Sequence, residues 1–214
     1  MQTGPQTAKA RWWKKAEGKT LKCQLCPREC AIAEGRKGFC QVRQNIGGEL
    51  FSLSYGYPVA IHVDPIEKKP LAEFMPGTRT FSIGTYGCNL NCSFCQNYQL
   101  SRGSYNEQSR SDYASPELIV ELAPKHGCSS IAFTYNEPTV FAEYAFDIAT
   151  LAKRAQIPTV IVSNGYITLE AARDLYPLIN AANIDMKGFS EEFYRDMTGA
   201  RLKPVLDAME YFHK

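Results

Sequence analysis

This 214-residue sequence has few histidines and no large surplus of either charge. The three histidines stand at positions 62, 126 and 213 and lack the spacing of a metal site, so we expect each at the surface or in the core. The 24 basic residues are balanced by 22 acidic ones. A net charge of +2 gives no basic face for nucleic acid, and no nucleic-acid partner is expected.

Long hydrophobic runs are missing as well. No run approaches the roughly 18 consecutive apolar residues that a membrane span needs, and residues 1–15 lack the apolar stretch of a signal peptide. We therefore expect a soluble cytoplasmic protein without a membrane partner. The 44% hydrophobic content allows an ordinary core, enough for one domain and a small appendage.

Cysteine, in contrast, is abundant. Seven of the eight cysteines fall into two groups with the short spacings of metal sites, and nothing in the sequence directs export. This pattern indicates a reducing compartment and metal ligation rather than disulfides. The eighth cysteine, Cys128, is expected to be a small buried apolar residue.

The first group, Cys88, Cys92 and Cys95, has C-x3-C-x2-C spacing with Phe94 directly before the last cysteine. A cubane iron-sulfur cluster has four irons, so three thiolates leave one iron with an open coordination position. An open position is where a catalytic metal site binds its small molecule. The alternatives are a zinc knuckle without a nearby fourth ligand, or cysteines that are merely buried.

The second group, Cys23, Cys26, Cys30 and Cys40, has C-x2-C-x3-C-x9-C spacing. Four thiolates form a complete ligand set for tetrahedral zinc and equally for a second cubane cluster. Thiolate spacing alone does not select the metal, so both alternatives stay open.

Residues 1–78 and 79–214 differ in character and predict two regions, a cysteine-rich N-terminal segment and a core that alternates strand and helix. Such alternation predicts an α/β fold with a parallel sheet, either open or closed into a barrel, whose active site lies at the carboxyl ends of the strands. The expected strands are 81–85, 130–135, 159–163 and 182–186, and the expected helices begin at Pro116, Pro138 and Pro204.

Polar side chains follow these strands. Asn136 and Glu137 come after the second and Ser163 and Asn164 after the third, where they could bind an ammonium, ribose or carboxylate group. Asp185 and Lys187 place an acid and a base after the fourth. A helix start, a plain turn and a local ion pair are the structural alternatives for the three sets. Polar groups at consecutive strand ends favour a shared functional site.

The cysteine loop with Phe94 resembles the radical S-adenosylmethionine (radical SAM) superfamily. The full set of motifs is similar to the radical SAM enzymes of the AmmeMemoRadiSam system, relatives of pyruvate formate-lyase activating enzymes, over nearly the whole chain. These motifs are Leu25–Arg28, Asp64–Leu71, the cysteine loop with Gln96 and Asn97, Thr134–Pro138 and Asn183–Gly188.

The resemblance implies a partial (β/α) TIM-like barrel, a 4Fe-4S cluster on the first cysteine group, and SAM on the open iron with Glu137 near its amino group. It implies reductive cleavage of SAM to a 5'-deoxyadenosyl radical that abstracts hydrogen from an unidentified substrate, with a glycyl radical on a partner protein as one form. An electron donor such as flavodoxin or ferredoxin is then required. The alternative is a non-catalytic iron-sulfur redox or scaffold protein.

Two departures from the family pattern stand out. Tyr135 and Asn136 replace the usual Gly-Gly before Glu137 and Pro138. Only about four of the six barrel strands are recognisable before Lys214, so we expect a fragment that lacks the last two strands. Such a chain is expected to bind the cluster but to cleave SAM poorly, because water exclusion and alignment need the missing wall.

Overall fold

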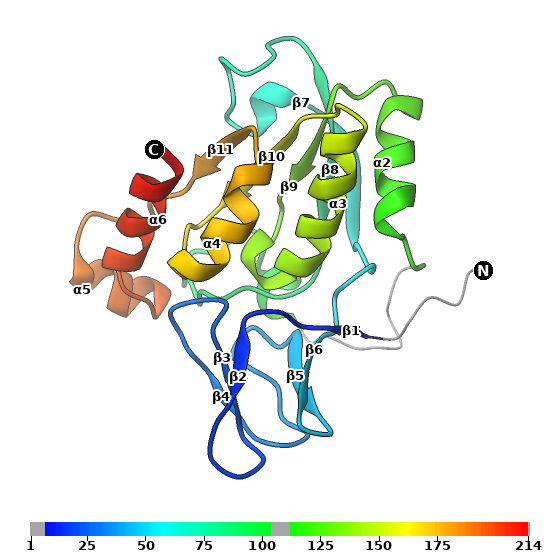
Figure 1. Ribbon diagram of the computed structural model, residues 1–214. Helices are drawn as coiled ribbons and strands as arrows, with labels where there is room; N and C mark the ends of the chain where they lie inside the picture. Colours follow the sequence, from blue (N-terminus) through cyan, green and yellow to red (C-terminus); the bar gives the residue numbers. More distant parts are fainter. Residues whose placement is uncertain (1–6, 104–111, 214) are drawn as a thin grey trace.

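A five-stranded sheet forms the centre of the computed structural model, which describes residues 7–103 and 112–213 (Figure 1). Its strand order is β11-β10-β9-β8-β7. The strands β8 to β11 are parallel, and β7 pairs antiparallel with β8. The predicted α/β class with a parallel sheet is confirmed. The five strands are β7 (Ala60–Pro65), β8 (Arg79–Gly84), β9 (Ser130–Phe133), β10 (Thr159–Ser163) and β11 (Ala181–Ile184).

The predicted strand positions hold to within two residues at either end. The range 159–163 is matched by β10 residue for residue. The second strand was expected to reach residue 135, but β9 ends at Phe133 because Tyr135 turns the chain with a φ of 72°. The division expected between residues 78 and 79 separates β7 from β8, which are hydrogen-bonded neighbours in the sheet. The two-region organisation stays a prediction.

Four helices cover one face of the sheet in Figure 1: α2 (Pro116–Lys125), α3 (Ala142–Arg154), α4 (Leu169–Leu175) and α6 (Lys203–His213). Pro116 begins α2 as expected, with the Ser115 side chain accepting from the Leu118 amide. Pro138 instead opens a 3-10 turn, η3 (Pro138–Phe141), that precedes α3. The shorter elements are η1 (Ile66–Lys68), α1 (Tyr98–Arg102), η4 (Tyr176–Leu178), α5 (Glu191–Phe193) and the π turn η5 (Tyr194–Thr198).

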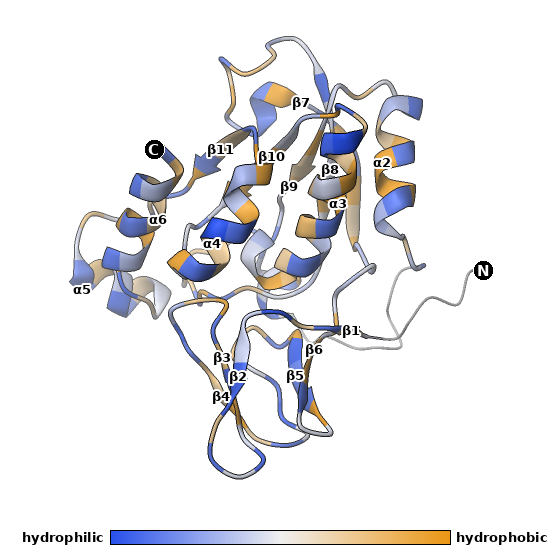
Figure 2. Cartoon of the chain, viewed as in Figure 1, coloured by the Kyte–Doolittle hydropathy of each residue, from blue (hydrophilic) through white to orange (hydrophobic). Residues whose placement is uncertain are grey.

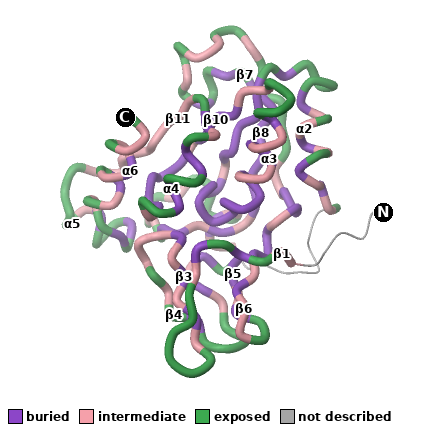
Figure 3. The backbone as a smooth tube through the Cα atoms, in the orientation of Figure 1, coloured by how far each residue is buried: buried purple, intermediate pink, exposed green. Residues whose placement is uncertain are grey.

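The main core lies between the sheet and these helices. Ile131 and Phe133 of β9 are fully buried against α3, whose Tyr144 and Ile148 are also inaccessible to solvent. Ala132 points to the opposite face and packs with Ile66, so β9 is covered on both sides. Each such apolar side chain contributes about 1.5–3 kcal/mol on burial. Figures 2 and 3 show the result: the buried centre of the sheet, and helices that turn hydrophilic, exposed faces outward.

The N-terminal segment forms two small antiparallel sheets below the main sheet in Figure 1, at the end where its parallel strands terminate. Its strands are β1 (Ala8–Lys9), β2 (Trp13–Lys15), β3 (Leu21–Cys23), β4 (Ala31–Ile32), β5 (Arg43–Ile46) and β6 (Glu49–Ser52). Among the described residues, no helix combines the length and apolar character needed to cross a membrane.

Candidate metal and cofactor site

A hollow of about 1040 Å³ opens at the carboxyl ends of the parallel strands. The structure brings all ten residues predicted for the core site to its lining, although they come from four separate stretches of chain. They are Cys88, Cys92, Phe94, Cys95, Asn136, Glu137, Ser163, Asn164, Asp185 and Lys187. Parallel strands end at one edge, which is why sequence-distant residues meet here.

The cysteine loop follows β8 and is fixed at both ends. Gly87 begins it with a φ of 93°, and two later amides, of Asn91 and Ser93, donate to carbonyls of η5 at 2.9 and 3.0 Å. The Leu90 amide donates to the sulfur of Cys88 at 3.4 Å, and the Cys95 thiol lies 3.6 Å from the Ser101 hydroxyl. The loop is therefore shaped by backbone contacts before any metal binds.

Burial raises the pKa of the Cys88 thiol to about 12 and also raises the pKa of Cys92. Both groups are neutral thiols at pH 7 unless a cation binds them, because a metal ligand has to be a thiolate. Metal binding at this loop must accordingly release protons.

Arg102 supplies a positive charge beside this loop. Its Nη2 donates to the Leu90 carbonyl, while its Nε is buried without a hydrogen-bond partner. Burial lowers the pKa of Arg102, and Cys88 is the largest influence in the opposite direction. A buried donor left unpaired is costly, and sulfur of an anionic cluster is an acceptor that would satisfy it. The loop thus fits a cubane cluster that leaves one iron free.

The zinc alternative for this loop stays open. Throughout residues 7–103 and 112–213, no three His, Cys, Asp or Glu side chains are grouped as a metal-ion site. The three thiols nonetheless line one hollow, as a larger cluster needs.

Asn136 holds the start of the cysteine loop. Its Oδ1 accepts from the Thr85 amide at 2.9 Å, and its Nδ2 donates to the Gly87 carbonyl at 2.9 Å. The side chain is buried, and these bonds use most of its capacity. Its placement supports a role in positioning the cysteines.

Glu137 is buried and ties two strand ends together. Its Oε1 accepts from the amide and hydroxyl of Thr139 and from the Ser163 hydroxyl, and its Oε2 accepts from the Asn164 amide at 2.8 Å. Burial raises the pKa of the carboxyl, although these donors oppose the shift. Because Oε2 accepts only one bond, it keeps a lone pair for a further donor in the hollow.

Asn164 links the third strand end to the cysteine loop. Its Nδ2 donates to Asn89 Oδ1 at 3.0 Å and lies 3.8 Å from the sulfur of Cys88. The side-chain oxygen of Asn164, Oδ1, accepts from the Tyr166 backbone amide at 2.8 Å. Asn164 is therefore a direct neighbour of the predicted cluster ligand.

Asp185 and Lys187 form an ion pair of 2.8 Å at the edge of the hollow, with side chains 42% and 26% exposed. Burial acts to lower the pKa of Lys187, but the bond to Asp185 raises it overall, so the ammonium stays charged. The local ion-pair alternative is thus realised in the structure, and the same two groups line the hollow. Phe94 stands at the rim, 46% exposed, with its ring 6.0 Å from that of Phe193.

Three further residues line the hollow although the sequence analysis gave them no role: Lys68, Lys69 and Tyr135. All three side chains donate to the carboxylate of Asp64. Burial alone would raise the pKa of Asp64, but these three hydrogen bonds hold it well below its usual range. The signal for the two lysines was the Asp64–Leu71 motif, where Lys68 and Lys69 follow Asp64 by four and five residues, whereas Tyr135 reaches Asp64 from a distant segment.

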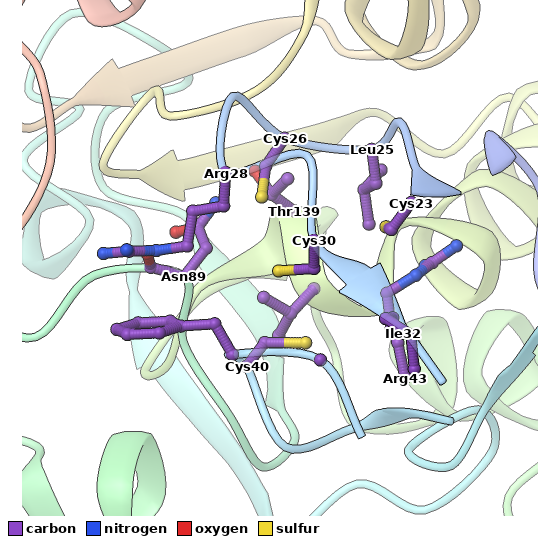
Figure 4. Close-up of a pocket in the computed structure, with 13 residues that line it drawn as sticks. Cys23, Leu25, Cys26, Arg28, Cys30, Ile32, Cys40, Arg43, Asn89 and Thr139 are labelled. Carbon is purple, nitrogen blue, oxygen red and sulfur yellow. The ribbon is translucent and has the colours of Figure 1, made fainter. Parts of the chain in front are cut away.

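The four N-terminal cysteines line a separate, smaller cavity together with Asn89 and Thr139 (Figure 4). Asn89 directly follows Cys88, and Thr139 donates to Glu137, so residues beside the large hollow also wall the small one. The two predicted cysteine sites are therefore adjacent in the fold. Cys128, the remaining cysteine, is buried as a small residue.

Residues 82–214 match the family model of the radical SAM superfamily, and the chain belongs to this superfamily. Members use a 4Fe-4S cluster and SAM, and they are generally enzymes. The match covers β8 to α6 with all three cysteines of the loop. The narrower AmmeMemoRadiSam resemblance stays a prediction.

Among curated proteins, the chain is 38% identical over 205 residues to an uncharacterized protein of Methanocaldococcus jannaschii, MJ0808, and covers 96% of itself and 60% of that protein. It is 25% identical over 133 residues to the putative glycyl-radical enzyme activating enzyme MJ1632 of the same organism. That match covers 61% of this chain and 48% of MJ1632. The chain thus spans between about half and three fifths of the relatives it matches.

Among solved structures, the chain is similar to SuiB of Streptococcus suis bound to S-adenosylmethionine, with 17% identity and a TM-score of 0.45. The match covers 61% of this chain and 28% of SuiB. A likeness at this level carries no argument about ligands or activity here.

Proposed function

We propose that this chain provides the cluster-binding part of a radical SAM enzyme, with Cys88, Cys92 and Cys95 as ligands of a 4Fe-4S cluster. The observation that carries the proposal is the convergence of these cysteines with polar groups from three further strand ends in one hollow. When bound, the reduced cluster and SAM supply a 5'-deoxyadenosyl radical for hydrogen abstraction.

The chain's own residues would orient the cluster and SAM. The Nδ2 of Asn164 lies 3.8 Å from the sulfur of Cys88, and the buried Nε of Arg102 is a donor still without a partner. The free lone pair on Oε2 of Glu137 suits the ammonium of SAM, and the charged Lys187 suits its carboxylate. Ser163 and Thr139 hold the Glu137 carboxylate in place, so little reorganisation is needed when the ammonium arrives.

The substrate is proposed to be a segment of a partner protein, with a glycine as the hydrogen donor. The hollow of about 1040 Å³ is at the upper limit of the roughly 300–1,000 Å³ of small-molecule pockets, which leaves room beside SAM. The similarity to a protein described as a putative glycyl-radical enzyme activating enzyme supports the same class of substrate.

The test is anaerobic reconstitution with iron and sulfide, reduction with dithionite, and measurement of 5'-deoxyadenosine formed from SAM. The wild-type chain and Cys128→Ser, a buried cysteine outside both groups, should form detectable product even at a low rate, whereas Cys92→Ser should form none. An iron-sulfur protein that neither binds nor cleaves SAM would reject the proposal in favour of a redox or scaffold protein.

The substrate class needs a separate measurement. Peptides deuterated at the glycine α-carbon should transfer deuterium into 5'-deoxyadenosine if glycine is the hydrogen donor. Product without deuterium would reject the glycyl-radical proposal and leave SAM cleavage standing.

A further inference from the structure

The cavity between the four N-terminal cysteines has a specific shape. Cys23 ends β3, Cys26 and Cys30 lie between β3 and β4, and Cys40 precedes β5. Figure 4 shows the side chains of Cys26, Cys30 and Cys40 among the residues that line this cavity. The cavity has a volume of about 20 Å³, more than the roughly 10–15 Å³ that one water molecule requires.

These dimensions bear on the identity of the metal. In a tetrahedral zinc site each Zn–S bond is about 2.3 Å, which puts the sulfurs about 3.8 Å apart, in contact with one another. No water-sized space remains between them. The cavity that the four cysteines line does contain such a space. It leaves room for a group larger than one ion.

A buried cation faces the same cavity. Arg43 is 1% exposed and lines the cavity; its Nη1 donates to Glu143 at 2.9 Å and its Nη2 to the Arg11 carbonyl at 2.8 Å. Its Nε is buried without a partner. A cluster held by four thiolates is anionic, and its sulfurs accept hydrogen bonds. Such a cluster would supply the acceptor that the Nε of Arg43 lacks.

The cavity backs directly onto the first cysteine loop. A Cβ placed on Gly87 would lie 2.6 Å from the Cys40 carbonyl, so the two backbones touch. The ring of Phe39 lies between the guanidinium groups of Arg28 and Arg102, at 3.4 and 4.1 Å from its centre. Arg102 donates both to the Phe39 carbonyl and to the Leu90 carbonyl of the cysteine loop, so one cation contacts the surroundings of both sites.

We infer that Cys23, Cys26, Cys30 and Cys40 hold a second iron-sulfur cluster of the cubane class, not zinc, immediately behind the cysteine loop of the first. The inference concerns a different set of ligands from the proposed function and does not depend on SAM cleavage.

Metal analysis of the full chain tests the inference, with reconstitution in an anaerobic solution that contains iron, sulfide and equal zinc. Two cubanes give about eight irons per chain and no zinc. Replacing Cys26 and Cys30 by serine should leave about four irons, as should replacing Cys92 and Cys95, whereas Cys128→Ser should keep all eight. About four irons with one zinc in the wild type, or about four irons and no other metal, would overturn the inference.

Electron paramagnetic resonance tests the placement by a readout independent of activity. The dithionite-reduced wild type should show a spectrum broadened by magnetic interaction of two neighbouring clusters, while each double variant shows one isolated signal. A wild-type spectrum equal to the sum of the two variant spectra would overturn the placement. Should a variant fail to fold, the wild-type iron and zinc counts still decide the identity of the metal.

Discussion

Arg102 donates from Nη1 to the carbonyl of Phe39 at 3.0 Å, and the same guanidinium lies 4.1 Å from the centre of the Phe39 ring. The contact joins the end of α1, which follows the first cysteine group, to the residue before Cys40 of the second. It fixes a cation between two predicted metal sites, and the cation's effect on each site is open to measurement.

Removing the charge of Arg102 should make the first cluster harder to reduce, because a nearby cation favours the more negative reduced state. We expect Arg102→Met to lower the reduction potential by about 59 mV, a tenfold change for one electron. A potentiometric titration followed by electron paramagnetic resonance measures it. Arg79→Met, at the opposite end of β8, is the control and should leave the potential unchanged. Equal potentials at equal iron content would contradict the role given to Arg102.

Gly87→Ala should destabilise the junction of the two cysteine sites. The φ of 93° disfavours a side chain, and the new Cβ would meet the Cys40 carbonyl at 2.6 Å and Val42 Cγ2 at 2.9 Å. We expect the free energy of unfolding to fall by about 1–3 kcal/mol in anaerobic urea titrations. Gly77→Ala is the matched control, because Gly77 has a φ of 76° with open space around it. A loss no larger than that of the control would show that the close approach is unimportant.

Asn136→Ala should reduce iron binding without touching a cysteine. The change leaves the Thr85 amide and the Gly87 carbonyl without partners, at a cost of about 1–3 kcal/mol for buried groups. We expect lower iron content after reconstitution and a less stable fold. Asn180→Ala, which removes an acceptor from the Thr159 amide at the far end of β10, should keep the full iron content. Normal iron loading of the Asn136 variant would exclude the positioning role.

Asp64→Asn should expose the cost of the buried charge on Lys69. The two side chains are 6% and 2% exposed and pair at 2.7 Å, and burial lowers the pKa of Lys69. Removing one partner of a buried pair costs about 3–5 kcal/mol. Asp207→Asn, in an exposed pair with Lys203, should cost less than about 1 kcal/mol.

The free energy of unfolding lost in Asp64→Asn should depend on pH, because the pKa of Asp64 is lowered in the folded state. A carboxyl whose folded-state pKa lies below the unfolded value near 3.9 stabilises fully above that value and loses its contribution as pH falls through the folded-state pKa. The gap in unfolding free energy between wild type and Asp64→Asn should therefore be constant from about pH 5 to 7 and shrink in stronger acid. A gap that widens on acidification would contradict the pairing.

The first cysteine group, which we propose as cluster ligands, could be picked out from the sequence because its spacing is local. Cys88, Cys92 and Cys95 lie within eight residues, so one loop brings them together whatever the rest of the chain does. The strand at residues 159–163 was equally predictable from the sequence, since a short β-branched run flanked by turn residues favours a buried parallel strand. Order along the chain then placed the polar groups at one edge of the sheet, where the structure has them.

Only the tertiary structure decided how those polar groups are used. Glu137 and Asn136 looked alike in sequence as groups that could face a cofactor, yet each takes hydrogen bonds from residues more than 20 positions away. Contacts between distant segments also decide the antiparallel pairing of β7 with β8. The same contacts leave the buried Nε atoms of Arg43 and Arg102 without hydrogen-bond partners. Hydrogen-bond partners and cavity size arise from packing, and no local pattern encodes them. Thiolate spacing left zinc and a second cluster equally open in the N-terminal segment, and the second cluster that we infer there rests on the cavity that the four cysteines line.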